Sequence, residues 1–247
     1  MTDYNPFHVK DKNLLITGAS SGIGRTTAIE CSKMGATVNI VGRDIWRLSE
    51  TYSKLEGTNH QRFISDLTIE NEVSALVAKL SPLDGIVHSA GIIKRIPLRL
   101  INEQNFENIL RINLIAIGIL TQKLYKNKLI KDGASIVIIS SVGANIASIG
   151  NILYMASKGG VNSFMKGAAL ELARHDIRIN CIEPGMVKTN LTKGISDEEI
   201  QKDVQRYPLG RYCTPEEVAW ASIYLLSDAT KFITGTFLKI DGGLTLR

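Results

Sequence analysis

Residues 14–25 read LLITGASSGIGR, a short apolar run that ends in a glycine-rich turn, after which a helical pattern begins. A strand, a glycine turn and a helix N-terminus in this order place free backbone N–H groups against a pyrophosphate. Gly18 would permit the tight turn, Gly22 the close approach of the phosphates, and Gly24 the packing of helix on strand. The spacing G-x-x-x-G-x-G differs from the commoner G-x-G-x-x-G, and a plain β–α turn is the alternative. We interpret the turn as nucleotide-binding.

On either side of this turn, β-rich runs alternate with helical patterns. The expected strands are Asn13–Ile16, Thr37–Val41, Arg62–Ser65, Gly85–His88, Ser135–Ser140, Arg178–Ile182 and Phe237–Ile240. The expected helices are Gly24–Met34, Ile45–Leu55, Glu70–Leu80, Gln104–Leu129, Ala156–His175 and Pro215–Leu226. Several strands are continuous apolar runs, as in parallel sheets that are covered on both faces. We predict an α/β fold with one domain over residues 1–247, a Rossmann-type, doubly wound, parallel seven-stranded sheet with helices on both faces.

The composition agrees with a globular protein and excludes several classes. Of the 247 residues, 44% are hydrophobic and 21% are charged, which suits a sizeable core. No apolar stretch is long enough to cross a membrane, and the N-terminus lacks a signal-peptide pattern, so we expect a cytoplasmic protein. Cys31, Cys181 and Cys213 are scattered and the four histidines show no ligand spacing, so we expect neither disulfides nor a metal site. The net charge of +5 without a long basic block gives no reason to expect nucleic acid.

A second group of polar residues lies in ISSVGANIASIGNILYMASK, residues 139–158. Tyr154 and Lys158 are four apart in a segment of helix-forming composition, so both side chains leave the same face. A phenol has a pKa near ~10, and a neighbouring ammonium lowers it by about 1–3 units, toward neutral pH. The hydroxyl of Ser141, at a separate strand end, would hold the oxygen of a reacting group. The Y-x-x-x-K spacing is common by chance, but the glycine turn favours a catalytic interpretation.

Taken together, T-G-x-x-x-G-x-G and the distant S…Y-x-x-x-K resemble the short-chain dehydrogenase/reductase family. The resemblance runs from about Lys10 to Gly243 and includes Asn113 in RINL, Glu183-Pro184-Gly185 with Thr189, and the ending ITGTFLKIDGG. One departure is His88-Ser89-Ala90-Gly91, where the family has N-N-A-G. We interpret His88 as a structural substitute at a strand end, and expect the nucleotide contacts here to be mostly main-chain.

The resemblance implies hydride transfer between C4 of a nicotinamide and a carbonyl carbon. Tyr154 would donate the proton, and Ser141 would hydrogen-bond the developing oxyanion. Lys158 would lower the pKa of Tyr154 and bind the nicotinamide ribose. Asn113 would hold a water that resupplies the proton, although an amide that only packs inside a helix is the alternative.

The same resemblance implies NADP(H) as the cofactor. Where a carboxylate would repel a 2′-phosphate, at the end of the second strand, this chain has Gly42, and Arg43 follows it. Two observations oppose this assignment: Arg43 could instead pair with Asp44, and Ser21 stands where NADP-preferring relatives often have a basic residue. The expected cofactor contacts are Gly18, Ser20, Ser21, Gly22, Ile23, Gly24, Arg43, Asp66, Leu67, Ser89, Ala90, Gly91, Tyr154, Lys158, Pro184, Gly185, Val187 and Thr189.

Among family members, the pattern is most similar to bacterial 3-oxoacyl-[acyl-carrier-protein] reductases, so the expected substrate is an acyl-thioester ketone. A reductase of a sugar or another small ketone, as in cell-surface polysaccharide pathways, is the alternative. A nucleotide-sensing regulator would typically lose Tyr154 or Lys158, and nothing in the sequence favours a purely structural subunit. The substrate pocket would be walled by Ile92–Leu100, Asn145–Leu153 and a substrate loop at about residues 186–207.

Two features bear on partners. Carrier-dependent relatives meet the acidic acyl carrier protein with two arginines, at positions that match Asp132 and His175 here, although Lys131 and Arg174 each lie one residue earlier. Relatives form tetramers through the helices that match Gln104–Leu129 and Ala156–His175 and through the C-terminal strand, so we expect a homotetramer. Small residues at helical spacing agree with close helix packing, either between subunits or on this chain's own sheet; they are Ala156, Gly160, Ser163 and Gly167.

Overall fold

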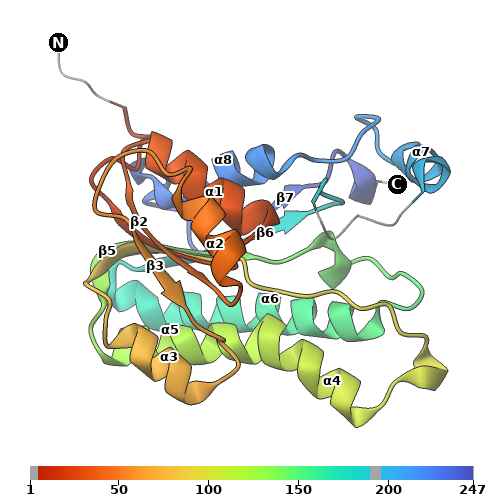
Figure 1. The fold of residues 1–247 in the computed structure, drawn as a ribbon. Helices are drawn as coiled ribbons and strands as arrows, with labels where there is room; N and C mark the ends of the chain where they lie inside the picture. Colours follow the sequence, from red (N-terminus) through yellow and green to blue (C-terminus); the bar gives the residue numbers. More distant parts are fainter. Residues whose placement is uncertain (1–4, 190–195, 247) are drawn as a thin grey trace.

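The structure is a computed structural model that describes residues 5–189 and 196–246. Its centre is a seven-stranded parallel sheet with the strand order β3-β2-β1-β4-β5-β6-β7 (Figure 1). The strands are β1 (Asn13–Thr17), β2 (Thr37–Gly42), β3 (Gln61–Ile64), β4 (Leu83–His88), β5 (Ile130–Ile139), β6 (Arg178–Pro184) and β7 (Phe237–Ile240). The order reverses between β1 and β4, as in a doubly wound fold.

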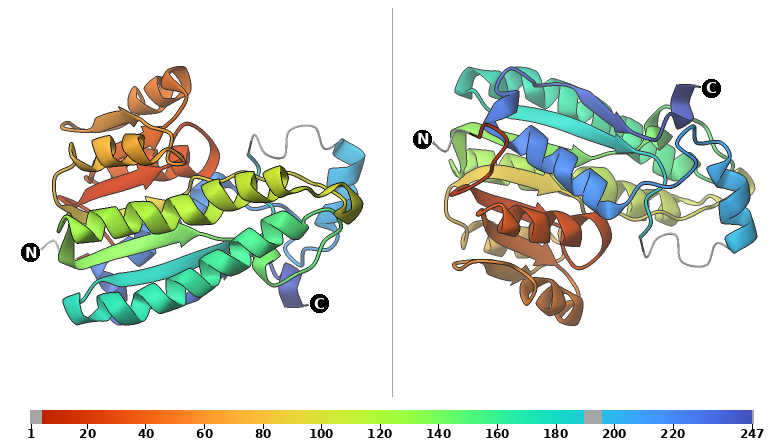
Figure 2. Two further views of the ribbon diagram at one scale, coloured as in Figure 1. Left: turned by 90° about the horizontal axis from the view of Figure 1, so that it is seen from below. Right: turned by 90° about the horizontal axis from the view of Figure 1, so that it is seen from above.

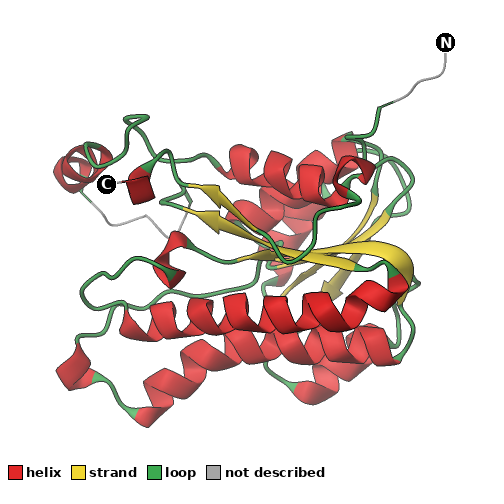
Figure 3. Ribbon diagram, turned by 180° about the vertical axis from the view of Figure 1, so that it is seen from behind, coloured by secondary structure: helices red, strands yellow, loops and turns green. Residues whose placement is uncertain are grey.

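Helices cover both faces of the sheet, as the sequence predicted (Figures 1, 2 and 3). One face carries α1 (Gly22–Lys33), α2 (Ile45–Tyr52) and α8 (Pro215–Leu226). The other carries α3 (Glu70–Val77), α4 (Glu103–Leu110), α5 (Ala116–Lys126) and α6 (Ile152–Leu172). A further helix, α7 (Asp197–Val204), lies beyond the sheet, toward the C-terminal end of the chain. No helix in the described ranges is long and apolar enough to span a bilayer.

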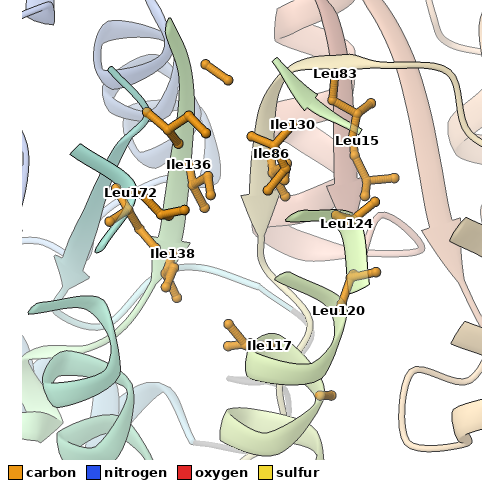
Figure 4. Close-up of a cluster of buried hydrophobic side chains, with 14 of the residues drawn as sticks. Leu15, Leu83, Ile86, Ile117, Leu120, Leu124, Ile130, Ile136, Ile138 and Leu172 are labelled. Carbon is orange, nitrogen blue, oxygen red and sulfur yellow. The ribbon is translucent and has the colours of Figure 1, made fainter. Parts of the chain in front are cut away.

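Strand side chains alternate between two hydrophobic layers. Leu14 and Ile16 of β1 pack in the cluster under α1 and α8, whereas Leu15 packs in the cluster under α3, α5 and α6. Figure 4 shows the second cluster, where strand residues meet Leu120 and Leu124 of α5. Each fully buried leucine or isoleucine contributes about 1.5–3 kcal/mol to the stability of the fold. This alternation explains why the strands appear in the sequence as continuous apolar runs.

Several elements differ from the sequence prediction. The helix expected over Ala156–His175 begins earlier, at Ile152, so that α6 includes Tyr154. β5 begins at Ile130 rather than Ser135, because an irregular stretch containing Gly133 (φ 78°) extends it, with a shift in its pairing to β4. The expected helix Gln104–Leu129 is interrupted by a π-helical turn, Arg111–Ile115, between α4 and α5. Such turns insert one extra residue without glycine or proline, so no breaker in the sequence reveals them.

The carboxyl ends of β1, β4, β5 and β6 meet at one edge of the sheet, because all strands are parallel. This edge brings together the turn after Thr17, the segment after His88, Ser141 and the chain after Pro184. In open α/β sheets, ligands bind at this edge, next to the reversal of strand order.

Candidate active site

The glycine turn after β1 is fixed against the segment after β4. The Thr17 hydroxyl accepts hydrogen bonds from the backbone N–H groups of Ser89 and Ala90, at 3.1 and 3.3 Å. Gly18 has φ 67°, and a Cβ there would lie 2.7 Å from the Ala90 nitrogen, so only glycine fits. A Cβ on Gly24 would lie 2.5 Å from the Gly18 carbonyl oxygen, which confirms close packing of α1 on the turn.

The side chain of Ser20 lies in the glycine turn, against the end of β2. Its hydroxyl is buried and has no hydrogen-bond partner among the residues that the structure describes. It faces Gly42 at the end of β2, where a Cβ would overlap it. A buried hydroxyl without a partner is costly, so an additional polar group is expected there. The residues present therefore fit a nucleotide, and no carboxylate at position 42 would repel a 2′-phosphate.

Arg43 does not pair with Asp44. Its Nη1 donates to the Asp66 carboxylate at 3.3 Å, whereas Asp44 accepts from the backbone N–H of Arg47 and caps α2. Burial raises the pKa of Asp66, but hydrogen bonds from the hydroxyl and amide of Thr68 and from Arg43 outweigh it and lower the pKa. The guanidinium remains 61% exposed, so it can still reach a ligand.

At residues 88–91, where the sequence departs from the family pattern, His88 has a structural role. His88 is 1% exposed, and its Nε2 hydrogen-bonds with the Thr121 hydroxyl at 3.0 Å. Burial lowers its pKa to about 4, so the ring is neutral at physiological pH. As expected for a structural substitute, His88 anchors the end of β4 to α5.

Ser141, Tyr154 and Lys158 come together at the end of β5 and the beginning of α6. The Ser141 hydroxyl accepts from the Gly143 N–H at 3.0 Å and hydrogen-bonds with Tyr154. Lys158 is 5% exposed; its Nζ donates to the Ile139 carbonyl at 2.8 Å and lies 5.7 Å from the centre of the Tyr154 ring. The three side chains thus form one cluster from two elements.

The pKa of Tyr154 is raised, not lowered as the sequence suggested. Burial of the phenol dominates, and the hydrogen bond with Ser141 only partly offsets it. Burial also lowers the pKa of Lys158 to about 8. The ammonium donates to Ile139 rather than to the phenol, so it does not outweigh the burial of Tyr154.

Asn113 sits in the π-helical turn and is fully buried. Its Oδ1 accepts from the Ile92 N–H at 2.8 Å, and its Nδ2 donates to the Ile92 carbonyl and the Ser157 hydroxyl at 2.9 and 3.0 Å. A Cβ on Gly91 would lie 3.3 Å from Asn113 Oδ1 and 3.8 Å from Lys158 Nζ. Both N–H donors of the amide are used, so its side chain holds the segment after β4 against α6.

The chain after β6 closes the other side of the site. Val187 pairs with Cys213, and a Cβ on Gly22 would lie 3.3 Å from Thr189 Cγ2. A surface pocket of about 390 Å³ lies between the glycine turn and the chain after β6. Its lining comprises Ser21, Gly22, Arg25, Thr26, Lys188, Thr189 and Pro215. This is where the glycine turn was expected to hold a pyrophosphate.

Some expected contacts have buried apolar side chains. Leu67 and Val187 are each 8% exposed and pack in the two hydrophobic clusters. Only their main chains are therefore available to a cofactor. Ile23 also packs against the core. Pro184 is the last residue of β6, and the N–H of the following Gly185 donates to the Ile240 carbonyl at 2.9 Å.

The three expected pocket walls are neighbours in the structure. The Ile96 N–H donates to the Gly150 carbonyl at 2.7 Å. Hydrogen bonds from Ser196 lower the pKa of Glu199 on α7, and the positive charge of Arg95 lowers it further. Because Arg95 belongs to the wall Ile92–Leu100, α7 lies near that wall. Residues 190–195 of the expected substrate loop lie outside the described residues.

Sequence reasoning missed a hydrogen-bond network that joins the exposed Asn145 to the buried Ser140, Asn162 and Glu183. Its signals in the sequence were the match at Glu183-Pro184-Gly185 and an acidic residue in the fully buried strand RINCIEP. No cluster of three or more His, Cys, Asp or Glu residues that could hold a metal occurs in the described part of the chain.

Comparison with known proteins agrees with this geometry. The family model described as enoyl-(acyl carrier protein) reductase matches residues 18–245. The chain is 34% identical to the 3-oxoacyl-[acyl-carrier-protein] reductase of Rickettsia prowazekii, over 95% of this chain and 97% of that protein. It is 32% identical to the gluconate 5-dehydrogenase of Gluconobacter oxydans, over 97% of each.

Solved structures place it in the same group. A gluconate 5-dehydrogenase from Burkholderia cenocepacia, crystallised with NADP and tartrate, superposes with a TM-score of 0.90 at 27% identity, over 98% of both chains. The glycine turn, the Ser141–Tyr154–Lys158 cluster and these matches over nearly the whole chain lead to one conclusion. The protein is a member of the short-chain dehydrogenase/reductase family of oxidoreductases.

Proposed function

We propose that the protein reduces a ketone to a secondary alcohol with NADPH. The observation that carries this proposal is the convergence of Ser141, Tyr154 and Lys158 beside the glycine turn. When bound, NADPH supplies the hydride for the carbonyl carbon. The raised pKa of Tyr154 keeps its phenol protonated at neutral pH, so the proton for the carbonyl oxygen is available there.

The neighbouring residues support that proton transfer. Ser141 hydrogen-bonds with Tyr154 and would hold the same carbonyl oxygen, which orients the ketone. Lys158 lies next to Tyr154 and Gly91, where it would bind the nicotinamide ribose. Asn113 would keep the segment at Gly91 and Ile92 in place and would leave any water contact to its main chain.

Arg43 and Ser20 support NADP(H) rather than NAD(H). We predict that Arg43→Ala lowers the preference for NADPH over NADH by roughly ten- to hundredfold, because a charge-assisted phosphate contact contributes about 1.5–3 kcal/mol. The measurement is kcat/KM for both cofactors. Arg47→Ala is the control. Arg47 lies on α2 and pairs with Asp44, so its removal should leave the preference for NADPH unchanged. Equal kcat/KM for the two cofactors in the wild type would rule out the phosphate contact.

For the substrate, we propose a small polar ketone of the sugar or sugar-acid class. The carrier alternative relies on Lys131 and Arg174, but Lys131 lies at the beginning of β5, about 30 Å along the strand from Ser141. It is also neutralised by Asp84, with both carboxylate oxygens at 2.9 Å. The exposed Arg95, by contrast, belongs to the first pocket wall, next to Gly150 of the second, and would attract an anionic substrate. The relative named gluconate 5-dehydrogenase supports the same class.

A comparison of substrates tests this proposal. NADPH oxidation is measured with 5-keto-D-gluconate, acetoacetyl-N-acetylcysteamine and acetoacetyl-[acyl-carrier-protein]. We expect 5-keto-D-gluconate to have the highest kcat/KM. Fastest turnover of the carrier-bound substrate, with a steep decrease in salt, would favour the carrier alternative, because exposed charge pairs are screened within about 10 Å at 0.1 M. No turnover of any ketone in a broader panel would overturn the reductase proposal.

We also propose that the protein is a homotetramer. Large apolar side chains are exposed on α4, on the π-helical turn and on α5 and α6; they are Phe106, Ile115, Ile119 and Leu170. Of the small-residue stripe, Ala156, Ser163 and Gly167 are exposed, whereas a Cβ on Gly160 would lie 2.7 Å from Leu114 of the same chain. Exposed apolar surface of this kind marks subunit contacts. Light scattering at micromolar concentration should give four times the chain mass of 27.1 kDa, and a monomeric mass would refute it.

A further inference from the structure

A buried carboxylate lies beside the active site without a cation to balance it. Glu183, at the end of β6, is 1% exposed. No ion pair among residues 5–189 and 196–246 includes it. Burying an ionised carboxylate costs several kcal/mol unless hydrogen bonds compensate. The hydrogen bonds of Glu183 therefore indicate what it does.

Within the described part of the chain, the side-chain hydrogen bonds to this carboxylate come from asparagines. Asn145 Nδ2 lies 3.0 Å from each carboxylate oxygen, and Asn162 Nδ2 lies 2.7 Å from Oε1. The Ser140 hydroxyl in turn donates to Asn162 Oδ1 at 2.7 Å. The network thus joins the end of β5, the chain after it, helix α6 and strand β6.

The network adjoins the catalytic cluster. Ser140 precedes Ser141, and Asn162 lies one helical turn after Lys158 on the same face of α6. Glu183 therefore connects the strand end that carries the Ser141 hydroxyl to the helix that carries Tyr154 and Lys158.

The contact with Asn145 adjoins the turn that follows Ser141. A single 3-10 turn, Val142–Ala144, separates the two residues, and the Asn145 N–H closes it on the Val142 carbonyl at 2.9 Å. Within this turn the Gly143 N–H donates to the Ser141 hydroxyl at 3.0 Å. That N–H occupies one acceptor position of the oxygen, which directs the hydroxyl toward Tyr154. A displacement of Asn145 would therefore move the N–H that orients Ser141.

We propose that Glu183 is a positioning residue for ketone reduction. Through Asn145 it holds the turn Val142–Ala144, and thereby the Ser141 hydroxyl, in the geometry that orients the carbonyl oxygen. This inference rests on the proposed reductase function, because it assigns a role to Ser141 in that reaction.

A charge exchange between Asn145 and Glu183 tests the proposal. Asn145→Asp places a second carboxylate against Glu183, and we expect kcat to fall roughly ten- to hundredfold. Addition of Glu183→Gln gives the new aspartate an N–H donor, while the glutamine oxygen still accepts from Asn162. The double variant should recover kcat to within roughly threefold of the wild type. The substrate is the ketone of the panel above with the highest wild-type kcat/KM.

The readouts separate positioning from direct contact and from folding. The Kd for NADPH, measured by fluorescence titration, should change less than about twofold in every variant. If Asn145 acted by touching the substrate, a change at the buried Glu183 would not restore kcat. Asn127→Asp is the matched control, because the exposed Asn127 at the end of α5 donates to the Lys123 carbonyl at 2.8 Å instead of Glu183, at the opposite edge of the sheet from the catalytic cluster. Its kcat should stay near that of the wild type.

Three outcomes would contradict the positioning role. They are a double variant no more active than Asn145→Asp alone, an Asn145→Asp variant as active as the wild type, and a loss of NADPH affinity that matches the loss in kcat. A wild-type protein that binds NADPH but reduces no ketone would instead refute the proposed function on which this role depends.

Discussion

Replacing Tyr154 by phenylalanine is expected to lower kcat by roughly a hundredfold or more, since a positioned general acid contributes about 10²–10⁴-fold. The substitution removes only the phenolic oxygen and its proton. Because Tyr154 is half-buried and its pKa is raised, the phenol carries this proton at neutral pH. The buried Lys158 donates its own hydrogen bond to the Ile139 carbonyl.

The affinity for NADPH should be nearly unchanged in Tyr154→Phe, because the cofactor contacts of the glycine turn and of Arg43 are intact. Steady-state kinetics and a fluorescence titration measure the two quantities. Tyr125→Phe is the control: its hydroxyl hydrogen-bonds with Arg174 at 3.0 Å, at the far end of α6. A Tyr154→Phe variant that keeps more than a few per cent of wild-type kcat would exclude Tyr154 as the proton donor.

The arrangement of the fold was accessible from the sequence because its signals are local. Each parallel strand is an apolar run buried on both faces, and the turn at Gly18 and Gly24 has no room for a Cβ. Strand ends of a parallel sheet meet at one edge, so the glycine turn and Ser141 could be placed together without coordinates. The π-helical turn at Arg111–Ile115 was missed, because it needs no helix-breaking residue.

The chemistry of the site was less predictable, because it depends on burial and on contacts between distant residues. The direction of the Tyr154 pKa shift was wrong, since spacing in a helix does not reveal the burial of the phenol. Asp66 as the partner of Arg43 comes from the neighbouring strand end, 23 residues away. The contact between Asn145 and Glu183 spans 38 residues and has no sequence periodicity. Such contacts are set by the packing of the sheet.

Lys158→Met is expected to separate activity from stability. The pKa of Lys158 falls from 10.5 to about 8 because its ammonium is buried. This corresponds to an unfavourable free energy of about 3 kcal/mol for the charged form at neutral pH. Methionine removes that cost but also the hydrogen bond to Ile139, which contributes about 1–3 kcal/mol. The variant should therefore be more stable by about 1 kcal/mol, while kcat falls roughly a hundredfold or more.

The stability difference between Lys158→Met and the wild type should depend on pH. Below pH 8 Lys158 is charged in both the folded and the unfolded protein, so the wild type bears the full cost of burial. Between pH 8 and 10.5 the folded protein loses the proton first, the cost disappears, and the advantage of the variant should vanish. The neighbouring Cys181 stays a thiol in this range, because burial raises its pKa to about 12.

Thermal unfolding at several pH values, with NADPH titrations alongside, measures these effects. At neutral pH the Tm of Lys158→Met should rise by about 2–4 °C, the shift expected from 1 kcal/mol in a protein of this size. Its affinity for NADPH should fall roughly tenfold, because the proposed contact of Lys158 with the nicotinamide ribose would be lost. Lys166→Met on the same helix, where the ammonium lies 5.3 Å from the Phe237 ring at the surface, should change neither kcat nor the affinity. A Tm for Lys158→Met below that of the wild type at neutral pH would mean that the buried ammonium stabilises the fold. Lys158 would then be retained for structure as well as for catalysis.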